Sequence, residues 1–133
     1  MWAKLNEFRW STPKRSIAKC HELLYVVGLD NDRKHTCITP IDMSIHKQLP
    51  KLKLEGEGAC RIASSNVTFG LITNNVVRIF SGGTTTNQLW NSEPLTDDSF
   101  LNLDYVDNRL TATTTNGKLV TFNSTDRSSF VVA

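Results

Sequence analysis

Two cysteines and two histidines in the first third of the chain are the residues most suited to binding a metal ion. Cys20 and His21 are adjacent, and His35 and Cys37 follow them. Two thiolates and two imidazoles form a common zinc ligand set. Neighbouring residues on a strand point to opposite faces, however, so Cys20 and His21 are poorly placed to share one ion. Because His35 and Cys37 supply only half a site, we predict neither a metal centre nor a cofactor.

Other residue types that support catalysis occur without the spacing that catalysis needs. A serine or cysteine nucleophile requires a histidine base and an orienting partner, and the sequence contains no nucleophile elbow. Gly82-Gly83 lacks the spacing of a phosphate-binding loop. We therefore predict that the chain is not an enzyme. One acidic group is either a loose calcium-binding candidate or a solvated loop, and it comprises Asp97, Asp98, Asp104 and Asp107.

Large aromatic residues and scattered cations are the remaining candidates for contact with a partner. Tryptophan is enriched in the energetic centres of protein interfaces, but it also packs readily between sheets. Cations beside hairpin turns either bind a partner or remain solvated. The candidate partner-binding residues are Trp2, Trp10, Arg33, Lys34, Arg78 and Trp90.

Composition and charge favour protein partners over nucleic acid. The 133 residues include 15 Lys and Arg against 13 Asp and Glu, a formal net charge of +2. This balance is too even for a nucleic-acid-coating protein, and the composition is that of an ordinary globular domain. A basic N-terminal stretch is either a solvated face or a patch for an acidic partner, and it contains Lys4, Arg9, Lys14, Arg15 and Lys19.

The sequence also indicates where the chain resides. No segment approaches the roughly 18 apolar residues of a membrane span, and Glu7 and Arg9 interrupt the place where a signal peptide would be apolar. The three cysteines are odd in number and show no close pairing, which favours free thiols in a reducing compartment. We expect a nuclear or cytoplasmic protein that is neither secreted nor inserted in a membrane.

An internal repeat organises these residues. The segment 73–80 aligns with 115–122, an offset of 42 residues, and the same step back reaches 31–38. Each segment starts with a polar turn and continues as a short strand that ends on a bulky apolar residue. The preceding strands align as well, at 23–29, 67–72 and 110–114.

The turn chemistry predicts a hairpin in every unit. Asn116-Gly117 is the strongest short signal, because a two-residue primed turn needs positive φ at both positions. Asn74-Asn75 and Asp30-Asn31-Asp32 place residues that tolerate the left-handed region at the equivalent bends. Short alternating stretches on either side of each hairpin add two further strands per unit.

Four strands that recur every 40 to 45 residues are typical of a β-propeller blade. One such sheet cannot cover both of its faces and must stack on a neighbour. The fold class predicted is all-β, with antiparallel four-stranded blades forming a partial propeller of about three blades. A single antiparallel sandwich is the alternative. The expected blades span 14–56, 57–96 and 97–133 of one domain, and 1–13 forms an N-terminal strand or arm.

The third strand of each unit resembles the WD repeat, in which a short apolar strand runs into an aromatic and an acidic residue. Phe80-Ser81 and Phe122-Asn123 stand in place of Trp-Asp, so the blades would be degenerate. The glycine pair Gly82-Gly83 and Gln88-Leu89 are also faintly similar to an RCC1-type repeat. Phe8-Arg9-Trp10 before a first blade without Trp-Asp is similar to the start of small WD-repeat nucleoporins in the Y-shaped scaffold of the nuclear pore.

These resemblances imply a binding function. We expect a non-catalytic scaffold that binds other proteins in a multi-subunit complex, with the nuclear pore as one such assembly. The alternative is an RCC1-like nucleotide-exchange or chromatin-binding propeller. Neither interpretation calls for a small-molecule substrate.

Overall fold

The computed structural model describes residues 14–56, 61–83, 86–123 and 127–132. Within these ranges the chain forms strands and turns, and they contain no helix able to span a membrane. The strands group into three sheets, which we call blades 1 to 3. Blade 1 contains β1 (Lys14–Cys20), β2 (Leu23–Leu29), β3 (His35–Asp42), β4 (Lys47–Gln48) and β5 (Leu52–Glu55). Blade 2 contains β6 (Ile62–Ser64), β7 (Thr68–Thr73), β8 (Val76–Ser81) and β9 (Asn87–Asn91). Blade 3 contains β10 (Phe100–Val106), β11 (Arg109–Thr114), β12 (Leu119–Asn123) and β13 (Ser128–Val131).

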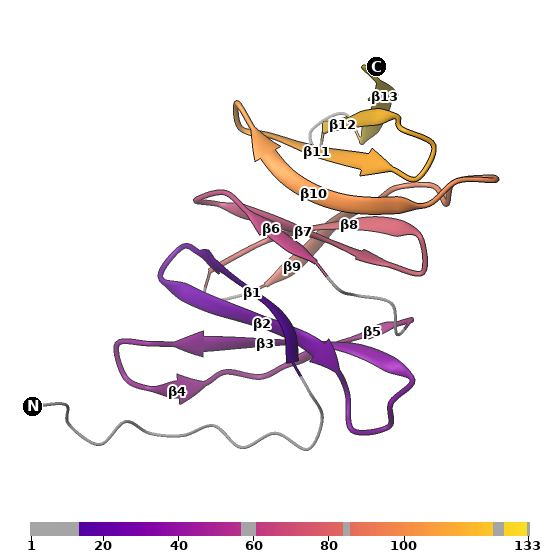
Figure 1. The fold of residues 1–133 in the computed structure, drawn as a ribbon. Helices are drawn as coiled ribbons and strands as arrows, with labels where there is room; N and C mark the ends of the chain where they lie inside the picture. Colours follow the sequence, from indigo (N-terminus) through magenta and orange to yellow (C-terminus); the bar gives the residue numbers. More distant parts are fainter. Residues whose placement is uncertain (1–13, 57–60, 84–85, 124–126, 133) are drawn as a thin grey trace, which may run out of the picture.

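The blades stack in the order in which the chain runs (Figure 1). In each blade the strands follow chain order and pair antiparallel with their neighbours. The first strands of the three blades lie next to one another, because β6 contacts both β1 and β10. This arrangement confirms the predicted all-β class and its antiparallel blades. The described residues do not form the two facing sheets of a sandwich.

The fourth strand of blade 1 is split, which the sequence did not predict. Both β4 and β5 pair with β3, with a gap at residues 49–51. Pro50 has no amide hydrogen to give to a ladder, so the strand cannot run through this position. The chain stays attached because Leu49 N donates to Pro40 O at 2.9 Å.

All three predicted hairpins are present, and the turn geometry matches the prediction in one of them and differs in two. Asn74 and Asn75 have φ of 47° and 60° between the paired residues Thr73 and Val76, which is the expected two-residue primed turn. At the third hairpin the prediction for Asn116-Gly117 was wrong, since Gly117 has φ of 81° and Asn116 is not left-handed.

The third hairpin instead closes through a loop of three residues. Gly117 N and Thr114 N donate to Thr114 O and Lys118 O respectively, each at 3.0 Å, as in a type I turn followed by a left-handed residue. In the first hairpin the left-handed residue is Arg33, with φ of 59°, rather than Asn31 or Asp32. The extra loop residues in the first and third hairpins carry polar side chains that can form hydrogen bonds with nearby backbone groups.

An aromatic core joins blades 1 and 2. Tyr25, Phe69 and Phe80 are fully buried, with ring centroids 4.4 Å apart for Tyr25–Phe69 and 5.1 Å apart for Phe69–Phe80. The Tyr25 hydroxyl accepts from Gly83 N at 3.0 Å and lies 3.1 Å from Thr86 Oγ1. The tyrosine therefore fills the core with its ring and satisfies its polar group at the rim.

A second core joins blades 2 and 3. Phe122 packs against Trp90 and Phe100 with centroid distances of 5.9 and 6.0 Å. Gly70 of β7 allows close approach, because a methyl group at its Cα would lie 2.5 Å from Leu110 Cδ2. Blade 2 is consequently buried on both faces, which explains why Phe69–Thr73 forms an unbroken buried run instead of an alternating one.

Candidate interaction surfaces

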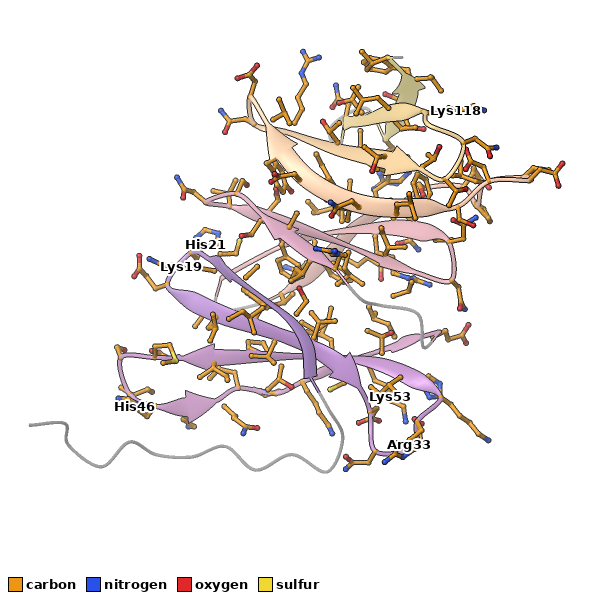
Figure 2. The ribbon with its side chains drawn as sticks, in the orientation of Figure 1. Lys19, His21, Arg33, His46, Lys53 and Lys118 are labelled. Atoms are coloured by element: carbon orange, nitrogen blue, oxygen red, sulfur yellow. The ribbon has the colours of Figure 1, made fainter. Side chains whose placement is uncertain are left out.

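The predicted cations Arg33 and Lys34 lie on an exposed turn at one end of blade 1. They connect β2 to β3, and Figure 2 shows Arg33 at the same end of the blade as Lys53 of β5. Antiparallel pairing of β5 with β3 sets Lys53 opposite Cys37. This register brings Lys53 of β5, and Lys51 just before β5, close to the turn between β2 and β3.

Two aspartates of this turn bind the returning lysines. Asp30 Oδ1 lies 3.0 Å from Lys51 Nζ, and Asp30 Oδ2 lies 3.2 Å from Lys53 Nζ. Lys53 Nζ also approaches Asp32 Oδ2 at 2.8 Å. The hydrogen bond from Lys51 lowers the pKa of the Asp30 carboxyl, and that from Lys53 lowers the pKa of the Asp32 carboxyl. The same contacts raise the pKa values of Lys51 and Lys53.

This ion-pair cluster neutralises most of its own charge. Asp32 also accepts from Lys34 N at 2.9 Å and contacts His35 Nδ1 at 2.7 Å. Among the described residues, the Arg33 and Lys34 side chains have no carboxylate within ion-pair distance. The turn therefore exposes two cations beside a largely neutralised ion-pair cluster. Exposed charges of this kind contribute to the rate and orientation of association.

Arg78 and Trp90, also predicted to contact a partner, lie elsewhere. Arg78 in β8 is half-buried and donates through Nε to Thr73 Oγ1 at 2.5 Å. Trp90 in β9 is half-buried and packs on Phe122 of the next blade. Both side chains thus have a structural role within the blades. The predictions for Trp2 and Trp10 fall outside the described residues.

Polar side chains hold the connection from blade 2 to blade 3. Asn75 Nδ2 donates to Leu95 O at 3.3 Å and Asp98 O at 2.9 Å, and its Oδ1 accepts from Phe100 N at 2.8 Å. Asp98 Oδ1 in turn accepts from Thr115 Oγ1 at 2.7 Å and Asn116 N at 3.0 Å.

These hydrogen bonds decide the protonation of Asp98. Burial opposes its ionisation, but the donors around it outweigh burial and hold the pKa of this carboxyl well below its ordinary value. Asp98, which the sequence marked as a calcium candidate, therefore fastens the connector to the Thr115–Gly117 turn.

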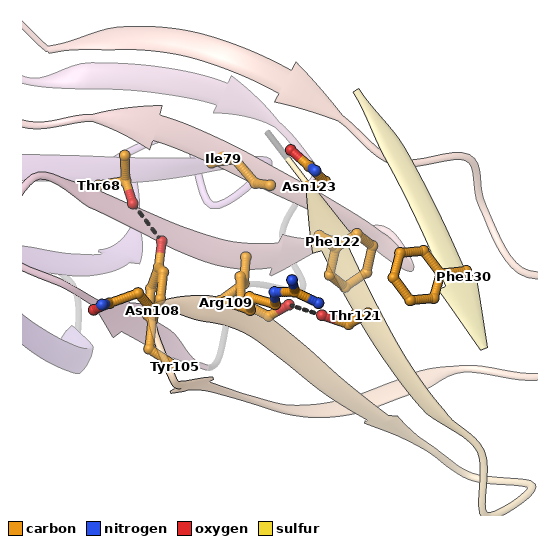
Figure 3. A pocket seen from close by; sticks show the side chains of 10 residues that line it. Thr68, Ile79, Tyr105, Asn108, Arg109, Thr121, Phe122, Asn123 and Phe130 are labelled. Carbon is orange, nitrogen blue, oxygen red and sulfur yellow. Dashed lines mark hydrogen bonds between the residues drawn. The ribbon is translucent and has the colours of Figure 1, made fainter. Parts of the chain in front are cut away.

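A pocket of about 280 Å³ opens at the opposite side of the same two blades (Figure 3). Phe122 and Ile79 form its apolar wall, Phe130 of β13 stands at its rim, and Arg109 lies beside it. Tyr105 OH and Thr68 Oγ1 are 2.7 Å apart across the blades. Burial raises the pKa of the Tyr105 phenol, so it stays neutral and serves as a hydrogen-bonding group.

The pocket is suited to a protruding side chain. Its volume lies below the roughly 300 to 1,000 Å³ of sites that enclose a drug-sized ligand. Its lining provides hydroxyls, one guanidinium and aromatic rings. Local sequence patterns do not reveal this site, because strand pairing within blade 3 brings Tyr105, Arg109 and Phe130 together. Blade stacking then adds Thr68 and Ile79 of blade 2. The apolar run that begins at Phe130 and continues with Val131 and Val132 was the available signal.

The four residues considered as zinc ligands do not converge. Cys20 belongs to the core shared with blade 2. Cys37 is adjacent in sequence to Ile38 of that core and therefore points to the other face of the sheet. His21 is exposed in the β1–β2 turn, and His35 contacts Asp32. Among the described residues, no group of three or more His, Cys, Asp or Glu side chains is placed to hold a metal ion.

Comparisons with known proteins identify no family for this chain. No protein-family model matches the sequence, and no curated protein matches it.

Proposed function

We propose that this chain is a non-catalytic scaffold that binds another protein through the outer edge of blade 3. The proposal is supported chiefly by exposed apolar residues on β13 and immediately after it. Phe130, Val131 and Val132 are 51%, 58% and 58% exposed. Contiguous apolar exposure of this kind marks interaction sites in soluble proteins.

The geometry around β13 fits an extended segment of a partner. β13 pairs with β12 along one side, and strand edges offer backbone donors and acceptors to a further strand. Phe130 stands at the rim of the 280 Å³ pocket. A partner strand added beside β13 would therefore direct an apolar side chain toward Phe122 while covering Phe130.

A matched pair of variants tests this proposal. Phe130 and Leu89 are both exposed apolar residues on the fourth strands of their blades. A partner that co-purifies with the full chain in stoichiometric amount is isolated, and its affinity for Phe130→Ser and Leu89→Ser is measured by calorimetry. We expect about a thirtyfold loss for Phe130→Ser, as for a central interface residue, and less than threefold for Leu89→Ser. Equal losses, or no stoichiometric partner, would contradict the proposal.

We further propose that the blades are degenerate WD repeats. Their second strands begin at Leu23, Thr68 and Arg109, spacings of 45 and 41 residues, in line with the 40 to 45 residues of that repeat. Phe80 and Phe122 occupy equivalent buried positions in third strands. This supports the WD type over the longer, glycine-rich RCC1-type repeat.

We propose a large nuclear or cytoplasmic assembly, such as the nuclear pore, as the setting of this scaffold. A fluorescent fusion of the protein that stays diffuse throughout the cell would argue against the nuclear pore.

A further inference from the structure

The pocket between blades 2 and 3 carries a single charge. Ten residues line it, all of them within the described ranges, and Arg109 is the one among them with a charged side chain. The others are apolar or carry hydroxyl and amide groups. Figure 3 shows the Arg109 side chain between those of Tyr105 and Phe122. The wall of the pocket therefore combines aromatic surface with one positive charge.

Within the described part of the chain, this charge has no counter-ion. The ion pairs found there all lie within residues 30–53 of blade 1. Asp107 belongs to the turn that immediately precedes Arg109, but the two side chains form no ion pair. Because Arg109 is exposed, water can solvate its guanidinium as long as the pocket is empty.

A partner segment that covers Phe130 removes water from this charge. Burial of a cation costs free energy, and a carboxylate that accepts hydrogen bonds from the cation offsets that cost. A partner segment with apolar side chains alone would leave the guanidinium unpaired, and a partner lysine or arginine would be repelled by it. The charge of Arg109 therefore favours a partner that brings a negative charge to the pocket.

Resting on the function proposed above, we infer that the partner segment carries an acidic residue two positions from its apolar anchor. The anchor points toward Phe122, and the carboxylate accepts hydrogen bonds from the guanidinium of Arg109. Residues two positions apart on a strand share one side and lie about 7 Å apart, so both can reach the same pocket. Arg109 belongs to β11, which is two strands away from β13. Glutamate, with its longer side chain, therefore fits better than aspartate.

Two blocked heptapeptides of matched shape test this inference. Thr-Glu-Thr-Leu-Thr-Glu-Thr places an acidic residue on either side of the leucine anchor, so it serves both possible strand directions. Its counterpart has glutamine in place of both glutamates. Each peptide is titrated at millimolar concentration into the isotope-labelled full chain, and the NMR signals of the Phe130 amide and of Arg109 Nε report the affinity. We expect the Glu peptide to bind about fivefold more tightly at low salt, with a smaller preference at high salt.

Charge variants locate the effect in the pocket. Arg109→Gln should remove the preference for the Glu peptide, and Arg109→Lys should keep part of it, because lysine retains the charge but not the planar fork of donors. Arg127→Gln is the matched control, since Arg127 is an exposed cation of the same blade that does not line the pocket. This control variant should bind both peptides as the unaltered chain does.

The outcomes separate this inference from the scaffold function. Equal affinity for the two peptides, or a preference that survives Arg109→Gln, would overturn the inference. If both peptides bind equally and Phe130→Ser abolishes both, the edge of blade 3 binds extended segments and only the acidic selectivity is wrong. If neither peptide shifts the signals of the unaltered chain, the inference is overturned, and calorimetry with the stoichiometric partner decides the scaffold function on its own.

Discussion

The two interfaces between blades use equivalent strands but bury their aromatic rings to different degrees. Between blades 1 and 2, Tyr25, Phe69 and Phe80 are completely buried. Between blades 2 and 3, Phe100 and Phe122 remain 8% and 4% exposed, and a pocket opens beside Phe122. The aromatic rings of the first interface are thus closed to solvent, whereas a pocket directly adjoins the central phenylalanine of the second. This difference supports the proposal that the blade 3 end binds a partner.

Truncating the central phenylalanine of each interface should give the largest contrast. Phe69→Ala leaves a closed cavity beside Tyr25 and Phe80, so we expect a loss of about 3 to 5 kcal/mol of unfolding free energy. Phe122→Ala should cost about 1 to 2 kcal/mol less, because its site adjoins the existing pocket and can relax. Urea denaturation of both variants measures the difference. Equal costs would mean that the second interface is packed as rigidly as the first.

Adding one methyl group at the glycine of each interface should give a smaller contrast. A Cβ on Gly82 would lie 2.6 Å from Cys20 Sγ and 3.2 Å from the Tyr25 hydroxyl oxygen, both held in the first core. We expect Gly82→Ala to destabilise by about 1 to 3 kcal/mol through overpacking. Gly70→Ala meets the end of the flexible Leu110 side chain beside the pocket and should cost less. Thermal melts that rank the two variants in reverse would refute this account.

Removing the phenolic hydroxyl from each interface should have the smallest effect. Tyr25→Phe leaves Gly83 N without its acceptor, and we expect a loss of about 1 to 2 kcal/mol. Tyr105→Phe removes the bond to Thr68 at the wall of the pocket. Water can replace that partner, so the cost should stay below about 1 kcal/mol. Chemical denaturation with Thr68→Val as a companion variant checks whether the pair acts as one unit.

Much of the fold could be predicted because its signals are local. The strands around residues 23–38, 67–80 and 110–122 follow from alternation and turn residues near in sequence. The two-residue turn at Asn74-Asn75 was correctly predicted for the same reason. The loop at Asn116-Gly117 was not, because Asp98 holds Asn116 N from 18 residues away. A turn that is bound by a distant carboxylate does not follow from its own two residues.

The candidate surfaces were less predictable because they depend on pairing between distant elements. The β3–β5 register sets Lys53 opposite Cys37 and brings it near Asp30. Stacking of blades sets Tyr105 against Thr68, which lies 37 residues earlier. Trp90 packs against Phe122 of the next blade, and its residue type alone could not indicate this contact. Residue types indicated which side chains could contact a partner, and the tertiary arrangement was needed to show where these side chains lie.

Strand order within each blade follows the chain without crossovers. This order has a consequence for how the protein folds during its synthesis. A sheet whose strands are connected by short hairpins has a small entropic cost of loop closure, and it therefore forms quickly. Because synthesis proceeds from the N-terminus, blade 1 can assemble on the ribosome and offer Tyr25 as a template before Phe69 and Phe80 are translated. Blade 3 would then dock last, at the interface that keeps a pocket beside Phe122. Folding would then be vectorial, proceeding from the interface whose aromatic rings are fully buried toward the one that keeps a pocket beside its central phenylalanine.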